Sequence, residues 1–366
     1  MWLGILAAVL LAAGGGIVYL TYAVGKFGIV KKLSGDKASK RRIFSLGLIV
    51  AVFALTVVIF STVNAINILL HEVLFFAFFG LVIRIIKKIT GKSFKINWQG
   101  WLALGSSVIY LAVGYYLCHN VWQTNYELKT EKQIGSLRVA LFADSHIGTV
   151  FDGEGFAEHM ETINEQSPDI VVIAGDFVDD GTTLEDMQTA CKALSKIDAK
   201  YGVWLCLGNH DPGYYKSRKF SLDEMRAELE KNGVRVLEDE CQLIDNRFYL
   251  IGRKDKNTKD RKPISELMEG IDRDKYTIVL DHQPNDYENE AAAGADLVLS
   301  GHTHGGQFFP VTAVGEWIGA NDRTYGYEKR DDTEFIVTSG IADWAIYFKT
   351  GTKSEYVIID IEQVFS

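Results

Sequence analysis

Acidic residues are almost absent from the first third of this 366-residue sequence. Up to Asn120 there are only Asp36 and Glu72, against twelve Lys and Arg, whereas the rest of the chain holds 26 basic and 45 acidic residues. The two parts are therefore expected to face different surroundings. The acidic second part argues against non-specific binding to nucleic acid.

Cysteine is also scarce. The four cysteines show no Cys-x-x-Cys or other ligand-type spacing, and Cys206 lies inside the apolar run Val203 to Leu207, where a small buried hydrophobic residue is expected. There is no Asn-x-Ser/Thr acceptor site and no repeat or low-complexity segment. Nothing here divides the second part of the chain into smaller domains.

Long apolar runs dominate residues 1–120, at about 3–24, 43–63, 66–86 and 101–118. A membrane-spanning helix needs roughly 20 such residues, so we predict four transmembrane helices. A cleaved signal peptide is the competing interpretation of the first run, but no positive charge precedes it and the basic cluster follows it. A buried helical bundle is the alternative for all four, although soluble helices rarely lack charged faces.

The second and third runs are separated only by a polar hinge around Asn64 and Asn67, which predicts a tight hairpin. His71 and Glu72 follow near the start of the third span. An ionisable pair there is either a functional intramembrane site or a headgroup-level contact. Their closeness to the hairpin favours the headgroup-level contact.

Basic residues predict the orientation. Residues 26–42 carry seven Lys and Arg and residues 84–95 carry five, whereas the connection between the second and third spans carries none. Both basic segments are expected in the cytoplasm. We therefore predict a multi-pass protein of the cell membrane with everything after Asn120 on the extracytoplasmic side.

Residues 121–136 read as a linker and residues 137–366 as one domain. In that domain apolar strands alternate with amphipathic helices, and buried continuous strands with helical crossovers indicate a layered α/β sheet. Ligands in such sheets gather outside the carboxyl ends of the strands. Strands are expected near 137–142, 170–174, 201–207, 234–236, 242–244, 248–251, 276–280, 297–299, 335–339 and 356–361, and helices near 156–165, 184–197 and 222–232.

Five short polar blocks follow these strands. They contain five of the eight histidines, four of them directly beside Gly, Asp or Asn. A lone block is weak evidence, because a single buried His is often a core residue and Gly-Asp pairs are common turns. Together, mixed Asp, His and Asn side chains suit two divalent ions roughly 3.5–4 Å apart that share a bridging carboxylate. The blocks are Asp144-Ser145-His146, Gly175 to Asp179, Gly208-Asn209-His210-Asp211, Asp281-His282 and Gly301 to Gly306.

In order and content these blocks resemble the signature of the calcineurin-like metallophosphoesterases: D-x-H, G-D-x-x-D, G-N-H-D/E, H and G-H-x-H. The resemblance covers about residues 137–361. It implies a four-layer α/β fold, a β-sandwich flanked by helices, with two divalent metal ions of unassigned identity (Mn, Zn or Fe). By position, one ion would be held by Asp144, His146, Asp176 and His304, and the other by Asp176, Asn209, His282 and His302, with Asp176 bridging.

The resemblance also implies the chemistry. A metal-bridging hydroxide would attack phosphorus in line. His210 would stabilise or protonate the leaving oxygen, with Asp211 orienting it. Asp179 would stand behind the ligands and hold His146.

The spans and the extended Gly301 to Gln307 motif make the chain similar to the membrane-associated bacterial branch of that family and to animal transmembrane proteins with a metallophosphoesterase domain. Some members of that branch hydrolyse UDP-diacylglucosamine, and others have generic phosphodiesterase activity. One stretch departs from the pattern. Where an Arg-Pro-rich approach to the last strand is expected, residues 345–354 read Ala-Ile-Tyr-Phe-Lys-Thr-Gly-Thr-Lys-Ser.

Substrate contacts are expected from two segments. Arg253 to Lys262 is a basic run in an otherwise acidic domain, and Arg253 and Lys254 could receive phosphate or anionic headgroups, the alternative being a solvated loop. Tyr214, Tyr215 and Lys216 follow His210 closely and could line the pocket.

These features predict a membrane-anchored hydrolase with two metal ions, acting on a phosphodiester or pyrophosphate that could be lipid-linked. A phosphoprotein or phosphomonoester phosphatase is one alternative. A metal-binding receptor or scaffold without catalysis is another, of a different class.

Overall fold

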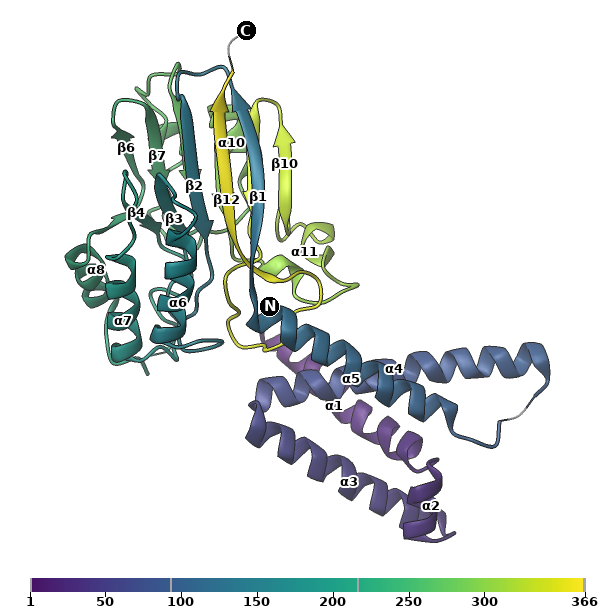
Figure 1. Cartoon of the computed structure of the whole chain (residues 1–366). Coiled ribbons are helices and arrows are strands. Elements are labelled where there is room, and N and C mark those ends of the chain that lie inside the picture. The colour runs from purple at the N-terminus through teal and green to yellow at the C-terminus, as the bar shows by residue number, and fades with distance from the viewer. Residues whose placement is uncertain (1, 93, 216, 365–366) are drawn as a thin grey trace. The chain divides into compact units, whose positions relative to one another are not determined.

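The chain folds into two units in a computed structural model that describes residues 2–92, 94–215 and 217–364 (Figure 1). One unit comprises Met1–Tyr115 with the short segment Ala345–Tyr347, and the other comprises Tyr116–Trp344 with Phe348–Ser366. We call them the helical unit and the catalytic unit.

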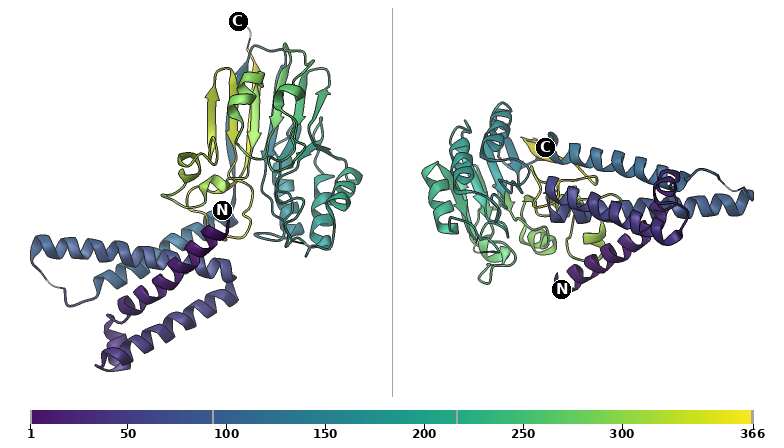
Figure 2. Two further views of the ribbon diagram at one scale, coloured as in Figure 1. Left: turned by 180° about the vertical axis from the view of Figure 1, so that it is seen from behind. Right: turned by 90° about the horizontal axis from the view of Figure 1, so that it is seen from below.

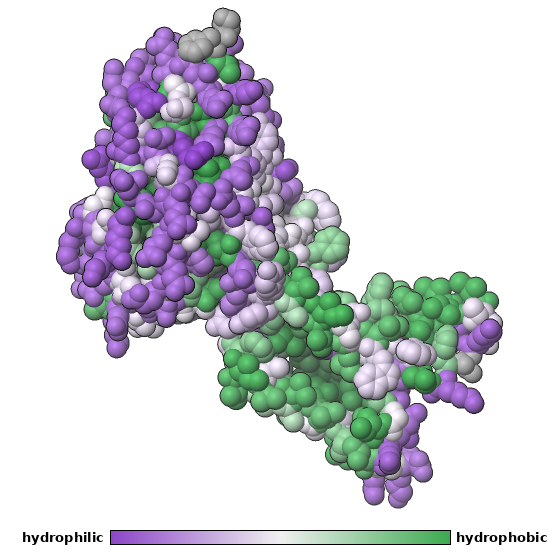
Figure 3. Space-filling model, in the orientation of Figure 1, coloured by the Kyte–Doolittle hydropathy of each residue, from purple (hydrophilic) through white to green (hydrophobic). Residues whose placement is uncertain are grey.

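The helical unit contains four helices that are long and apolar enough to cross a membrane. Figure 3 shows a largely hydrophobic surface over them, whereas the catalytic unit is mostly hydrophilic. This confirms the prediction of four apolar helices. The helices are α1 (Trp2–Val24), α3 (Ala38–Ile59), α4 (Thr62–Thr90) and α5 (Trp98–His119), with the short α2 (Gly28–Ser34) between the first two.

The hairpin between α3 and α4 lies several residues earlier than predicted. The turn falls at Phe60 and Ser61, and the Ser61 hydroxyl accepts the backbone N–H of Asn64, which caps α4. Serine is a favoured N-cap because its oxygen satisfies a free N–H of the first helical turn. Asn64 and Asn67 are therefore helical, and the prediction of a hinge around them is wrong.

The catalytic unit is built on two six-stranded sheets. The first has the order β1-β12-β2-β3-β4-β5, in which β2 to β5 are mutually parallel. The second has the order β10-β11-β9-β8-β7-β6, with parallel pairs from β11 to β7. The strands are β1 (Val121–Thr130), β2 (Ser136–Phe142), β3 (Ile170–Ala174), β4 (Val203–Cys206), β5 (Val234–Leu237), β6 (Glu240–Ile244), β7 (Phe248–Gly252), β8 (Tyr276–Leu280), β9 (Leu297–Ser300), β10 (Gly326–Arg330), β11 (Thr333–Val337) and β12 (Ser354–Gln363).

Apolar side chains pack in three layers between four layers of structure. One cluster, including Leu141, Val172 and Leu280, lies between the two sheets. A second joins the first sheet to α6 (Gly153–Asn164), α7 (Leu184–Leu194) and α8 (Leu222–Lys231). A third joins the second sheet to α9 (Ile264–Leu267) and α10 (Tyr287–Ala293), and Figure 2 shows α10 across the outer face of that sheet. The predicted sandwich flanked by helices is confirmed.

Residues 121–136 were predicted to be a linker, but most of them form a strand. Val121–Thr130 form β1, which pairs in parallel with β12 over ten residues at the edge of the first sheet. Thr124, Tyr126 and Leu128 point to the more buried side while the residues between them are exposed. That alternation of period two is the mark of a half-buried strand, and it was hidden by the polar composition of the exposed face.

Candidate metal centre

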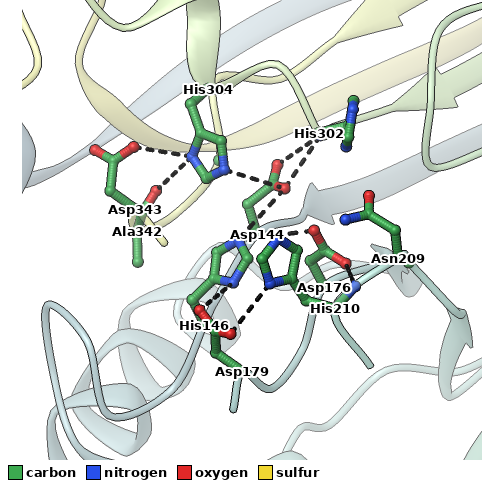
Figure 4. A network of polar contacts seen from close by, with 12 residues as sticks. Asp144, His146, Asp176, Asp179, Asn209, His210, His302, His304, Ala342 and Asp343 are labelled. Carbon is green, nitrogen blue, oxygen red and sulfur yellow. Dashed lines mark hydrogen bonds and ion pairs between the residues drawn. The ribbon is translucent and has the colours of Figure 1, made fainter. Parts of the chain in front are cut away.

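The five polar blocks meet at one edge of the sandwich, and Figure 4 shows side chains from four of them. Parallel strands in one sheet end on the same side, so the loops after β2, β3 and β4 lie together, as do those after β8 and β9 in the other sheet. The first three loops carry Asp144 with His146, then Asp176, then Asn209. The other two carry His282 and the pair His302 and His304.

Asp144, His146 and His304 form one buried group. Asp144 Oδ1 lies 3.9 Å from His146 Nε2 and 3.7 Å from His304 Nε2. His146 Nε2 is also 3.7 Å from Asp176 Oδ2. These distances are too long for hydrogen bonds, yet several electron-rich atoms surround a common point.

Asp176, His282 and His302 form a second group. His282 Nε2 lies 3.0 Å from Asp176 Oδ2 and 3.2 Å from Asn209 Oδ1, and the rings of His282 and His302 are 5.1 Å apart. Asp176 thus lies beside histidines of both groups, through His146 and His282. This is the position that a bridging carboxylate requires.

The donor set fits divalent cations on an independent ground. His146 is fully buried, and neither of its ring nitrogens has a hydrogen-bond partner among the described residues. A buried polar atom without a partner costs free energy unless an ion or water satisfies it. In addition, the proton on His282 Nδ1 is accepted by the carbonyl oxygen of Ala174 at 2.7 Å, so Nε2 is the nitrogen left to face a cation.

Strained backbone marks the same residues. Asp144, His146, Asp176, His302 and His304 all have φ between 36° and 70°, the left-handed region that non-glycine residues seldom occupy. Each such residue costs on the order of 1–3 kcal/mol and persists only where its surroundings demand it. Five of them in one cluster indicate that the fold is holding side chains in place for function.

Burial and neighbouring charges set the protonation states of Asp176 and His302 in the second group. Burial alone would raise the pKa of Asp176, but the neighbouring His282, with His146 and His210, holds that pKa well below its usual range. Burial, reinforced by the charge of His282, lowers the pKa of His302 to about 3. Asp176 is therefore ionised and His302 neutral at physiological pH, the states in which both can bind a cation.

His210 lies beside the first group without joining it. Its Nδ1 is 3.1 Å from Asp179 Oδ1, and the other oxygen of Asp179 is 3.4 Å from His146 Nδ1. Burial would lower the pKa of His210, but the hydrogen bond to Asp179 and the charge of Asp176 raise it overall. Asp179 thus orients His210 through a hydrogen bond, lies beside His146 at a longer distance, and favours a protonated His210.

Asp211 does not orient His210, contrary to the prediction. Its carboxylate accepts four backbone N–H groups at 2.7–3.1 Å. All four belong to the loops that carry Asp176 and Asn209. The role of Asp211 is to hold those two loops together, and Asp179 takes the orienting role. The four donors belong to Asp176, Phe177, Val178 and Gly208.

Arg253 is also placed differently from the prediction. It is 2 % exposed, and its Nη1 lies 2.8–3.0 Å from carboxylate oxygens of Asp281, Asp286 and Glu290. A guanidinium enclosed by three carboxylates has no face left for substrate, so the expected substrate contact is wrong. Lys254 is half-buried, and its backbone N–H donates to Asp239.

Tyr214 lies beside two residues of the candidate site. Its ring is 4.9 Å from that of His210, and its hydroxyl accepts a hydrogen bond from Asn209 Nδ2 at 2.8 Å. Tyr215 is exposed. Lys216 lies outside the described residues.

Two buried residues near the site escaped the sequence analysis. Asp343 Oδ1 lies 2.9 Å from His304 Nδ1, and Lys349 Nζ lies 3.4 Å from Asp343 Oδ2. Asp343 lies well beyond the end of β11 at Val337, directly after Ile341 and Ala342, so the pattern of a polar residue just after a strand, which marks Asp144 after β2, does not mark it. Lys349 falls in the stretch that departs from the family pattern, and nothing in its sequence context predicts burial.

Comparison with known proteins agrees with this geometry. The family model for calcineurin-like phosphoesterase matches residues 137–306. An uncharacterized metallophosphoesterase of Aquifex aeolicus is 32% identical over 196 residues, which cover 51% of this chain and 70% of that protein. Another, from Campylobacter jejuni, is 30% identical over 233 residues, or 62% of this chain and 59% of that protein.

An animal protein is also similar. The transmembrane protein with metallophosphoesterase domain of Danio rerio is 27% identical over 250 residues, which cover 64% of this chain and 55% of that protein. The match thus spans little more than half the length of the Campylobacter and Danio proteins.

Proposed function

Since the chain belongs to the calcineurin-like metallophosphoesterases, which are metal-dependent hydrolases of phosphate esters, we propose that it cleaves a phosphodiester or pyrophosphate bond in a substrate held at the membrane. The observation that carries the proposal is a pair of neighbouring His and Asp groups, in which Asp176 of the second group also lies 3.7 Å from His146 of the first. The ligands proposed are Asp144, His146, Asp176 and His304 for one cation and Asp176, Asn209, His282 and His302 for the other.

The protein's own residues supply orientation and a proton. When bound, the two cations provide a water of lowered pKa and neutralise the charge that develops on the phosphate. His210 keeps its Nδ1 against Asp179, so Nε2 is the nitrogen left to donate a proton to the leaving oxygen. Tyr214, in contact with His210 and Asn209, is proposed to line the substrate pocket, and Lys254 to contact an anionic group at its rim.

The four apolar helices support a lipid-linked substrate. A hydrolase tethered by several spans gains most when its substrate is confined to the same bilayer, because tethering then raises the local concentration of each for the other. We propose a lipid-linked phosphodiester or pyrophosphate, such as a nucleotide-sugar lipid. The basic residues of 26–42 and 84–95 support an extracytoplasmic catalytic unit.

Hydrolysis of a small panel by the full chain in nanodiscs tests the proposal. The panel holds a nucleotide-sugar lipid, its lipid-free counterpart, an aryl phosphodiester and an aryl phosphomonoester, with Mn²⁺ or Zn²⁺ added. We expect kcat/KM to be highest for the lipid-bearing pyrophosphate, and Asp176→Ala or a chelator to abolish turnover. His159→Ala, which changes a histidine on α6 outside the site, is the matched control and should retain activity.

Other outcomes identify the rivals. Equal rates on the lipid-bearing and lipid-free compounds would remove the argument for a lipid-linked substrate. Turnover of the monoester alone would indicate a phosphatase. Stoichiometric metal binding without turnover of any compound would indicate a scaffold that has lost catalysis.

A further inference from the structure

A buried ion pair stands behind one of the two metal positions. Asp343 and Lys349 are both fully buried, in the loops between β11 and β12. Buried charges are costly unless paired and hydrogen-bonded, so their presence needs a reason. Lys349 Nζ donates to the carbonyl oxygen of Ser339 at 2.8 Å and lies 3.4 Å from Asp343 Oδ2. The Asp343 carboxylate is thus held from behind.

The front of that carboxylate faces His304 (Figure 4). Asp343 Oδ1 lies 2.9 Å from His304 Nδ1, and the carbonyl oxygen of Ala342 lies 3.3 Å from the same nitrogen. Both neighbours are acceptors, so Nδ1 carries the proton, and Nε2, 3.7 Å from an oxygen of Asp144, is the nitrogen left to meet a cation. The pair therefore selects the tautomer and the ring orientation that a cation would need.

The two metal positions differ in this support. At the first, both imidazoles have a carboxylate beside Nδ1: Asp343 for His304 and Asp179 for His146. At the second, the one partner of His282 Nδ1 among the described residues is the backbone carbonyl of Ala174. A carboxylate behind an imidazole makes it a more basic and better fixed ligand than a carbonyl does. The first position should therefore bind its cation more tightly.

We propose that Asp343, held by Lys349, is a positioning residue for His304 and makes the Asp144–His146–His304 position the tighter of two unequal metal sites. The inference rests on the proposed metal centre but not on any substrate. Its tests are binding measurements, so a failure of hydrolysis leaves them intact, whereas a chain that binds no cation at all would refute the proposed centre itself.

The experiment is a titration of the metal-stripped full chain in detergent with Mn²⁺. Binding is monitored as the loss of the EPR signal of the free ion. Wild type should bind in two phases. His304→Ala should lose the tighter phase and His282→Ala the weaker one. Asp343→Asn, which has the same shape, should weaken the tighter phase about ten- to a hundredfold and leave the other unchanged. Added to His304→Ala, it should have no further effect.

Lys349 provides a second route. Lys349→Met should weaken binding in the tighter phase, and Lys349→Arg, which keeps the positive charge, should bind as wild type does. A purely structural role of the pair would not predict an effect on one phase alone. Glu355→Gln is the matched control, because Glu355 is an equally buried carboxylate bonded to Thr338 and Tyr325. The proposal is overturned if Asp343→Asn leaves both phases at wild-type affinity or weakens both equally, or if His304→Ala removes the weaker phase.

Discussion

At the scale of single residues, the site depends on positions with no room for a larger side chain. Gly208 follows β4 and lies against the backbone of the loop that carries Asp176. A Cβ at Gly208 would overlap the backbone nitrogen and a carboxylate oxygen of Asp176. Backbone atoms cannot rotate away as the end of a long side chain can, so any added methyl group must displace the carboxylate proposed to bridge the two cations.

Gly208→Ala is therefore expected to lower kcat/KM about a hundredfold or more, since a displacement near 1 Å at a reacting centre has that effect. The matched control is Gly181→Ala, because no atom lies within 4 Å of a Cβ at that position. Steady-state hydrolysis of the aryl phosphodiester checks both. Comparable activities in the two variants would contradict the packing described here.

A half-buried histidine outside the site should make the stability of the folded protein depend on pH. Burial lowers the pKa of His159, with Glu158 opposing the effect. Near the unfolded pKa of about 6.5 the unfolded chain then binds more protons than the folded chain, so stability falls as pH drops below that value. In His159→Gln the melting temperature should fall less between pH 7 and pH 5.5 than in wild type. Parallel curves for the two proteins would show that His159 contributes nothing.

The ligand types could be predicted because each is a chemically distinctive residue at the end of an apolar run. Roles that depend on partners distant in the sequence could not. Asp211 stands next to His210 in the chain, yet its carboxylate accepts three backbone N–H groups from the loop after β3 and one from its own loop. Arg253 sits in a basic run, yet three carboxylates enclose it. Adjacency in sequence predicted neither contact.

At the scale of elements, β1 ties the start of the catalytic unit to its last strand. It pairs with β12 along ten residues, and it buries Leu128. The central strands were predicted because both of their faces are buried and they read as continuous apolar runs. β1 and β10 were missed because edge strands expose one face, and polar residues on that face resemble a loop.

A fragment that begins at Asn120 should therefore be more stable than one that begins at Gly135. Removing β1 takes away the hydrogen bonds of a whole ladder and uncovers one side of β12. We expect the melting temperature to fall by at least about 5 °C, which corresponds to a loss of one to three kcal/mol for a domain of this size. Equal melting temperatures, measured by circular dichroism, would show that β1 does not stabilise the sheet.

At the scale of the whole molecule, the chain combines an apolar helical unit with an acidic catalytic unit. The proposed orientation places residues 26–42 in the cytoplasm and the catalytic unit outside. Single cysteines test it in intact cells: Lys129→Cys, on exposed β1, should react with a membrane-impermeant maleimide, and Asp36→Cys should react only after the cells are opened. The four native cysteines are buried or half-buried, so a wild-type control sets their background. The reverse labelling pattern would show that the catalytic unit lies in the cytoplasm.

The two sheets contribute different parts of the metal centre: Asp144, His146, Asp176 and Asn209 come from one, and His282, His302 and His304 from the other. A pair of cations there would cross-link the two sheets at one end of the sandwich. Removing the ions should speed hydrogen exchange at the strand ends beside the metal centre and leave exchange unchanged at the opposite end, where the β6–β7 hairpin turns. The chemistry would then begin only once both sheets have met, which makes catalysis a late product of folding.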